Sequence, residues 1–180
     1  MNFKHQVRVR RMIDDRNRRS GRYRQFAGLI AYLTVCLGVM AIGGVVTATT
    51  VDIWYQTLEK PDFAPPDWVF GPVWTGLYIL IAVAGWLVWR RVGVHGTAQL
   101  LFAGQLALNL AWSVLFFGMT WIGAALVEIV ILWIAIAATT AAFWSISRTA
   151  ALLFLPYLLW VGYAAALNGA IWVMNGRPFP

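Results

Sequence analysis

Five stretches of about 20 mainly apolar residues limit the fold of this chain more than any other feature. They cover about residues 26–48, 70–89, 98–118, 122–144 and 150–173. A helix of about 20 apolar residues can cross the hydrocarbon core of a bilayer, where only helices and closed barrels satisfy their backbone groups. The alternation of apolar and polar residues that is typical of barrel strands is absent. The sequence therefore predicts an all-α integral membrane protein, a bundle of five transmembrane helices.

The charged residues are concentrated before the first apolar stretch. Nine of the 14 Lys and Arg residues precede Phe26, so the net charge of +7 belongs mainly to this basic tail. The chain as a whole is 61% hydrophobic and 12% charged, which leaves too little polar surface for a soluble domain. A basic tail directly before a membrane span is typical of a topology signal or of contact with anionic lipid. We therefore expect membrane lipid, and no nucleic acid, as the partner of the tail.

The distribution of charge over the loops predicts the orientation. Basic residues follow the second and fourth stretches, on the same side of a five-span bundle as the tail, whereas residues 49–69 on the other side carry Asp52, Glu59, Asp62 and Asp67. Cytoplasmic loops carry the excess of Lys and Arg. We expect the N-terminus in the cytoplasm and the C-terminus on the opposite side of the membrane.

The loop between the first two stretches is rich in proline and aromatic residues. Pro61, Pro65, Pro66 and Pro72 restrict its backbone, so we expect an ordered loop. Its aromatic residues suit either an interfacial belt or the lid of a ligand pocket. Both interpretations remain open on the residues of the loop alone.

Polar and aromatic side chains share helical faces inside the stretches. Asn109 lies with Gln105 and Trp112 on one face, Trp74 with Tyr78 on a second, and a third carries Trp160, Ala164 and Leu167. These faces could line a pocket or could only pack and hydrogen-bond between helices, and spacing does not separate the two. For Glu128, the only acidic residue inside a stretch, we expect a structural hydrogen bond rather than a proton route.

No recognised catalytic or metal-binding motif is found. His5 and His95 have no neighbouring ligand cluster, so we predict no metal site, and the single Cys36 excludes an internal disulfide. A ridge of small residues in the third stretch, formed by Ala103, Ala107 and Ala111, permits close helix approach within the bundle or in a homodimer.

Three segments of the chain together resemble a known family. They are WYQTLEKPDFAPPDWVFGPVWTGLY, GQLALNLAWSVLFFG and LPYLLWVGYAAALN. In this order and at this spacing they closely resemble successive signatures of the TspO/MBR family, also called translocator proteins, tryptophan-rich sensory proteins or peripheral benzodiazepine receptors. The likeness covers about residues 28–175. It divides the chain into a basic tail (1–25), a membrane domain (26–175) and a short C-terminal tail (176–180).

The resemblance implies a five-helix bundle, usually dimeric, whose first loop closes a pocket. Family members bind tetrapyrroles such as protoporphyrin IX and haem. Matched by motif, the ligand-binding residues would be Trp74, Tyr78, Asn109, Trp112, Trp160, Ala164 and Leu167, and the lid would contain Trp54, Pro65, Pro66, Trp68 and Phe70. The third helix would supply the homodimer contact. Ala170 stands where the sterol-recognition motif of animal members has a tyrosine, so we do not expect sterol binding.

These expectations lead to one function and two alternatives. We expect a membrane receptor or transporter-like protein that binds tetrapyrroles, with a role in porphyrin transport or stress sensing and with porphyrin or haem as ligand rather than as obligatory cofactor. The first alternative is a light- and oxygen-dependent porphyrin-degrading enzyme, in which Trp74 and Trp160 would be the redox partners. The second is a regulatory membrane scaffold that acts through the basic tail.

Overall fold

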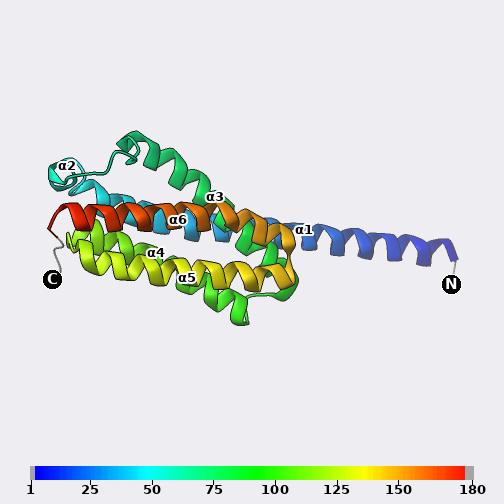
Figure 1. The fold of residues 1–180 in the computed structure, drawn as a ribbon. Helices are drawn as coiled ribbons and strands as arrows, with labels where there is room; N and C mark the ends of the chain where they lie inside the picture. Colours follow the sequence, from blue (N-terminus) through cyan, green and yellow to red (C-terminus); the bar gives the residue numbers. More distant parts are fainter. Residues whose placement is uncertain (1–2, 177–180) are drawn as a thin grey trace.

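The structure, a computed structural model, is a bundle of long helices and describes residues 3–176, with side chains described from Gly21 onward. The long helices lie along one another, with the short α2 in the first loop (Figure 1). The elements are α1 (Phe3–Ala48), α2 (Trp54–Thr57), the 3-10 turn η1 (Asp67–Val69), α3 (Phe70–Val92), α4 (Thr97–Ser113), the π-helical turn η2 (Val114–Gly118), α5 (Ile122–Ile146) and α6 (Arg148–Met174). Within the described residues there is no strand.

The five predicted membrane spans are confirmed. Helical segments long and apolar enough to cross a bilayer cover Gly21–Ala48, Asp67–Val92, Thr97–Gly118, Ile122–Ile146 and Arg148–Met174. The protein is therefore an integral, multi-pass membrane protein. Arg90 and Arg91, the basic residues that follow the second predicted stretch, lie inside α3. The helix ends at Val92 and is capped by Gly93, whose φ of 77° lies in the left-handed region that glycine adopts freely.

Helix α1 changes its neighbour along its length. Toward its basic end it lies close to α3, where a Cβ atom at Gly28 would come within 2.3 Å of the Trp89 ring. Toward its other end it approaches α4, where a Cβ atom at Gly43 would lie 3.3 Å from the Ser113 hydroxyl. Just beyond α1, the Thr50 hydroxyl donates a hydrogen bond to the Phe117 carbonyl at 2.9 Å. Small residues thus let α1 cross from α3 to α4.

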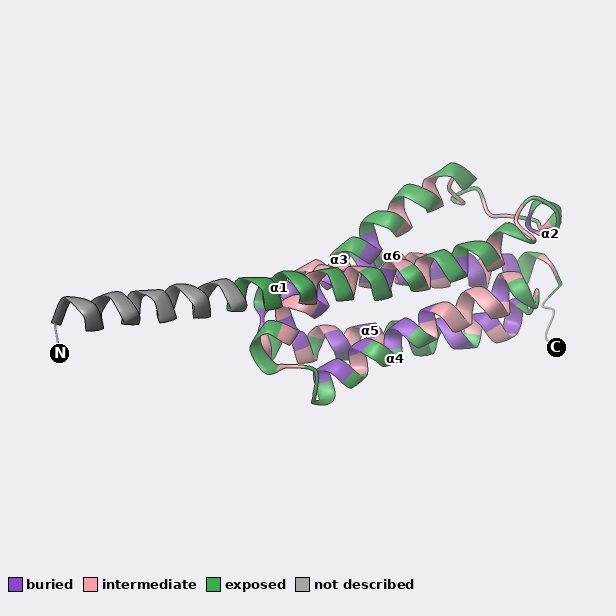
Figure 2. Cartoon of the chain, turned by 180° about the vertical axis from the view of Figure 1, so that it is seen from behind, coloured by how far each residue is buried: buried purple, intermediate pink, exposed green. Residues whose placement is uncertain are grey.

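The buried centre of the bundle is aromatic. Phe102 of α4, Phe143 of α5 and Phe154 of α6 form a cluster, with ring centroids 5.1 Å apart for Phe143 and Phe154 and 6.2 Å apart for Phe102 and Phe143. Figure 2 shows exposed residues along the outer faces of the helices, where large apolar side chains such as Leu100 and Leu159 face outward. In a membrane protein this surface faces lipid, so these outward apolar residues are expected there.

Tryptophan and arginine pair at the basic end of the bundle. The three pairs, with the distance from the guanidinium carbon to the ring centroid, are Arg24 over Trp89 (5.9 Å), Arg90 over Trp86 (4.7 Å) and Arg148 over Trp144 (5.8 Å). Indole rings and basic side chains are both enriched at the membrane–water boundary. The pairs therefore mark where this end of the bundle meets the headgroups.

Candidate functional site

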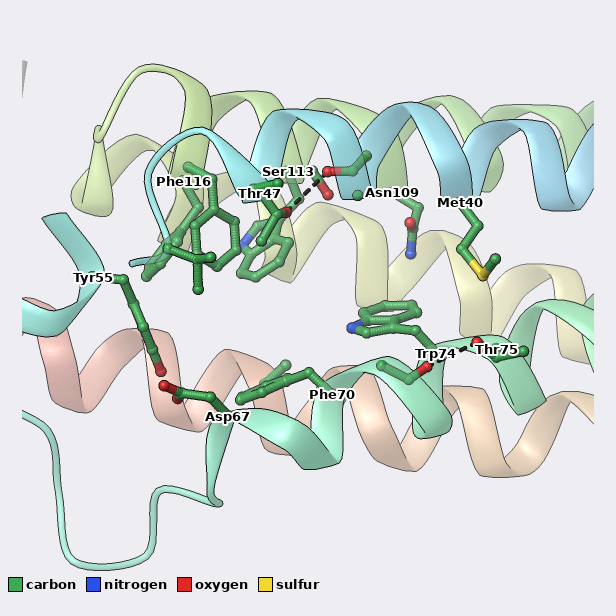
Figure 3. A pocket seen from close by; sticks show the side chains of 18 of the residues that line it. Met40, Thr47, Tyr55, Asp67, Phe70, Trp74, Thr75, Asn109, Ser113 and Phe116 are labelled. Carbon is green, nitrogen blue, oxygen red and sulfur yellow. Dashed lines mark hydrogen bonds between the residues drawn. The ribbon is translucent and has the colours of Figure 1, made fainter. Parts of the chain in front are cut away.

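The site is a cavity of about 620 Å³ near the loop end of the bundle. Residues from α1, α3, α4 and α6 line it, together with the turn η2 and parts of the first loop. Figure 3 shows Trp74 in the middle of the cavity wall, with the amide of Asn109 pointing toward its indole. Small-molecule sites commonly measure about 300–1,000 Å³ and are mainly apolar with a few placed polar groups. The cavity has this size and this character.

All seven residues predicted to bind ligand line this cavity. They come from three helices: Trp74 and Tyr78 from α3, Asn109 and Trp112 from α4, and Trp160, Ala164 and Leu167 from α6. The three faces that the sequence predicted are thus brought to one space. Ligand binding by these residues stays a prediction.

Aromatic contacts hold the wall of the cavity in place. Trp74 lies 5.7 Å from Tyr78 between ring centroids, and Phe70 meets Trp160 nearly edge to face at 6.0 Å. Trp112 and Phe116 are stacked, with centroids 5.2 Å apart and planes inclined by 22°. Offset and edge-to-face geometries are favourable for ring pairs. The wall consequently presents broad aromatic surfaces whose orientations are set by their neighbours.

A chain of hydrogen bonds orients the one amide in the middle of the cavity. The Tyr78 hydroxyl donates to Oδ1 of Asn109 at 2.5 Å, and Nδ2 of Asn109 donates to the hydroxyl oxygen of Tyr157 at 2.9 Å. Tyr157 is fully buried on α6 and does not line the cavity. These bonds connect three helices and fix the rotamer of Asn109. Sequence reasoning did not identify Tyr157 as part of this arrangement.

A second amide joins the cavity wall to the end of α5. Oδ1 of Asn168 accepts a hydrogen bond from Nε1 of Trp112 at 3.2 Å, and its Nδ2 donates to the Ile122 carbonyl at 3.1 Å. Asn168 is almost fully buried, where polar side chains are normally hydrogen-bonded, and these two bonds satisfy both ends of its amide.

Replacing Asn168 with alanine should lower the stability of the bundle by about 1–2 kcal/mol, because the Trp112 indole and the Ile122 carbonyl both lose their partner. Thermal unfolding in detergent, followed by circular dichroism, should show a midpoint lower by a few degrees. Leu159→Ala is the matched control, since Leu159 lies on the same helix and is 73% exposed to the lipid side. An equal loss in the two variants would contradict a specific role for the amide.

The first loop contributes two of its five predicted lid residues to the cavity. Trp68 and Phe70 line it, whereas Trp54, Pro65 and Pro66 do not. Trp54 packs against Phe116 with centroids 5.6 Å apart, and Pro66 precedes the turn η1. The three remaining residues therefore shape and support the loop rather than face the cavity.

The loop is fastened to the end of α6 at two points. The Glu59 backbone N–H donates to Oδ1 of Asn175 at 3.0 Å, and Nδ2 of Asn175 donates back to the Glu59 carbonyl at 3.0 Å. The Tyr163 hydroxyl donates to the Phe63 carbonyl at 2.9 Å. We call these two points the loop clasp. An ordered loop, as predicted from its prolines, is consistent with this attachment.

Tyr55 lies in α2 of the first loop and lines the cavity. Burial, followed by the carboxylate of Asp67 and by Tyr163, raises the pKa of its hydroxyl to about 12. The Lys60 ammonium lies 4.2 Å from the centroid of its ring. Tyr55 therefore presents a neutral hydroxyl to the cavity at every physiological pH.

The sequence analysis missed the contribution of α1. Met40, Gly43, Thr47 and their neighbours form one side of the cavity, and Figure 3 shows Met40 and Thr47 beside it. None of these residues is aromatic or charged, so no side-chain chemistry marked them. The available signal was the spacing of small residues at Ala41, Gly44 and Ala48, which lie on one helical face.

Four residues carry a buried side-chain polar atom without a hydrogen-bond partner among the described residues: Gln99 (Nε2), Gln105 (Oε1), Glu128 (both carboxyl oxygens) and Trp160 (Nε1). The prediction of a structural hydrogen bond for Glu128 is wrong, because neither of its carboxyl oxygens has one. Its side chain is 92% buried and does not line the cavity. Nε1 of Trp160, on the cavity wall, is also without a partner within the described chain.

Comparison with known proteins gives a consistent result. The sequence profile of the TspO/MBR family matches residues 31–173. The chain is similar to "Tryptophan-rich protein TspO" of Chlorobaculum tepidum, with 43% identity over 84% of this chain and 98% of that protein. It is also similar to human "Translocator protein" (42% identity, 71% of this chain, 80% of that protein) and to "Tryptophan-rich sensory protein" of Cereibacter sphaeroides (38%, 79% and 88%).

Proposed function

The chain belongs to the TspO/MBR family, and from this membership we propose that it binds tetrapyrroles such as protoporphyrin IX and haem within its helix bundle. The role that follows is transport or sensing of these molecules, in keeping with the names "Translocator protein" and "Tryptophan-rich sensory protein" of its relatives. The observation that carries the proposal is the aromatic cavity of about 620 Å³.

The chemistry of the cavity suits a broad, flat and mainly apolar ligand. Trp74, Trp112 and Trp160 supply indole faces from three helices, and ring stacking with burial of apolar surface would provide most of the affinity. The Asn109 amide, held by two tyrosine hydroxyls, would meet polar atoms of the macrocycle. These groups support a site in which stacking gives affinity and few polar contacts give orientation.

Titration of purified protein with protoporphyrin IX tests the proposal. We expect saturable binding with about one porphyrin per chain and a dissociation constant in the micromolar range or below, about −8 kcal/mol. Absorbance and fluorescence of the porphyrin report binding, and an unrelated five-helix membrane protein in the same detergent corrects for partition into micelles. A linear, unsaturable signal equal to that of the control protein would overturn the proposal.

The orientation remains part of the proposal. The Arg–Trp pairs and the basic tail share one end of the bundle, and the positive-inside rule assigns that end to the cytoplasm. The cavity and its loop would then lie toward the opposite face, where α6 also ends.

The small-residue ridge supports a homodimer through α4. Ala103 and Ala107 are exposed on the outer face of that helix, and Ala111 is half-buried. Gly104 adds to the flat surface, and a Cβ atom there would meet no atom within 4 Å. Small outward residues let two helices approach closely in lipid, where packing rather than hydrophobicity drives association.

A further inference from the structure

We propose that the cavity has a lateral entrance between α1 and α3 and that its ligand enters through this gap from the hydrocarbon of the bilayer. The inference rests on the proposed function for the class of ligand, a flat apolar molecule dissolved in the membrane, and adds its route. Five residues form the lateral rim: Ala41, Gly44 and Ala48 on α1, and Gly71 and Thr75 on α3.

The lateral rim is at once part of the cavity and part of the outer surface. All five residues line the cavity, and all five are exposed. Ala41, Gly44 and Ala48 share one face of α1, as Gly71 and Thr75 do on α3. At 1.5 Å per residue the rim of α1 extends about 10 Å along its axis, or roughly two turns into the membrane. Because residues of the membrane-spanning helices both line the cavity and are exposed, we infer that the cavity opens toward lipid at the rim.

Packing explains why the helices separate there. At the basic end α1 and α3 are held together, and a Cβ atom at Gly85 of α3 would lie 2.8 Å from the Tyr32 ring of α1. At the loop end α1 instead contacts the turn η2 that follows α4, where a Cβ atom at Gly118 would lie 3.2 Å from Val46. Figure 1 shows the first half of α3 leaning away from the rest of the bundle. The two helices therefore form a wedge that opens toward the loop.

Glycine residues on both helices keep the wedge between α1 and α3 open. A Cβ atom at Gly44 or at Gly71 would meet no heavy atom within 4 Å. Both positions adjoin free space rather than a packed neighbour, which is the opposite of Gly28 and Gly85 at the closed end. One such glycine lies on each side of the gap, Gly44 on α1 and Gly71 on α3, so no side chain closes the space between the two helices at this point.

The side chains of the rim allow an apolar ligand to pass. The hydroxyl of Thr75 donates to the Gly71 carbonyl at 2.9 Å, and that of Thr47 donates to the Gly43 carbonyl at 2.9 Å, as drawn in Figure 3. Both hydroxyls are thereby satisfied by the backbone of their own helix. The rim residues are alanine, glycine and threonine, so a molecule dissolved in hydrocarbon meets no charged side chain there.

Filling the rim tests the route. The variant Gly44→Leu, Gly71→Leu places two bulky side chains in the gap at positions where an added Cβ atom meets no heavy atom within 4 Å. Stopped-flow fluorescence in proteoliposomes, with protoporphyrin IX first equilibrated into the lipid, measures the rates of association and dissociation. We expect both rates to fall by about ten-fold while the dissociation constant changes by less than about three-fold, since a barrier slows entry and exit equally.

The chain offers a matched control. Gly38 on α1 and Gly76 on α3 are exposed and adjoin free space like the rim glycines, but they do not line the cavity. The variant Gly38→Leu, Gly76→Leu adds the same bulk and the same helix propensity to the same helices, and it should bind at the wild-type rates. Unchanged rates in the rim variant, or equal slowing in the two variants, would overturn the lateral entrance.

A measurement without porphyrin separates this inference from the proposed function. A bimane fluorophore on Ala164→Cys, in a Cys36→Ala background, reports from inside the cavity. We expect phospholipids with brominated acyl chains to quench it, and quenching to fall by about half or more in the rim variant but not in the control. Equal quenching in the rim variant and in the control variant would contradict the lateral entrance. If the expected quenching pattern were found but the protein bound no porphyrin saturably, only the assignment of porphyrin as the ligand would be wrong.

Discussion

Replacing Trp74 and Trp160 together with alanine should weaken porphyrin binding by about 100-fold or more. The two rings face the cavity from α3 and α6, each beside a second aromatic ring that sets its orientation. Burial of one large aromatic side chain against a ligand contributes about 1.5–3 kcal/mol, and 2.7 kcal/mol is a factor of about 100. The measurement is the porphyrin's own absorbance and fluorescence, because protein fluorescence changes when tryptophans are removed.

The control for this experiment removes two tryptophans that lie outside the cavity. Trp121 and Trp144 are 42% and 51% exposed and do not line it. Trp121→Ala, Trp144→Ala should leave the affinity within about two-fold, which shows that the loss follows the position of the rings and not their number. Equal affinity in the cavity variant and in the wild type would remove the site assigned to the porphyrin.

The membrane fold could be predicted from the sequence because bilayer thickness dictates the length of each apolar stretch. The limits of the third and fourth stretches agree with the structure to within two residues. The predicted second stretch ends at about Trp89, before the end of α3 at Val92, because Arg90 and Arg91 end the apolar run but not the helix. Basic side chains at a helix end can reach the headgroups while their backbone stays helical, so charge alone does not end a helix.

The site could be predicted only where side-chain chemistry marks it. Trp74, Asn109 and Trp160 carry rings or an amide at helical spacing, and all three line the cavity. The wall formed by α1 is made of small residues, whose position depends on how α1 crosses from α3 to α4. That crossing follows from packing between residues far apart in sequence, such as Gly28 with Trp89. Periodicity within one helix contains no information about it.

The same limitation applies to the loop. Its prolines predicted order but not what holds it, since Glu59 and Asn175 are separated by 116 residues. Three of the five predicted lid residues turn away from the cavity, because a loop of this composition needs its own internal packing. The attachment to α6 is the part of the site with the most direct bearing on how long a ligand stays bound.

Breaking the loop clasp should therefore shorten the residence of a bound porphyrin. In the variant Tyr163→Phe, Asn175→Ala the Phe63 carbonyl and both backbone groups of Glu59 lose their partners on α6. Three hydrogen bonds of about 0.5–1.5 kcal/mol each would be lost, partly replaced by water, so we expect the dissociation rate to rise by about ten-fold. Displacement of bound porphyrin by excess apoprotein measures it.

Loosening of the loop itself provides the second readout. Limited proteolysis without ligand should cut the variant within residues 58–66 about ten-fold faster than the wild type, because cleavage follows the population of the detached loop. Thr57→Ala is the control: its hydroxyl bonds the Trp54 carbonyl inside the loop and makes no contact with α6. If the clasp variant were cleaved faster yet released porphyrin at the wild-type rate, the loop would open independently of ligand exit. Porphyrin would then have to leave the cavity entirely through the lateral gap between α1 and α3.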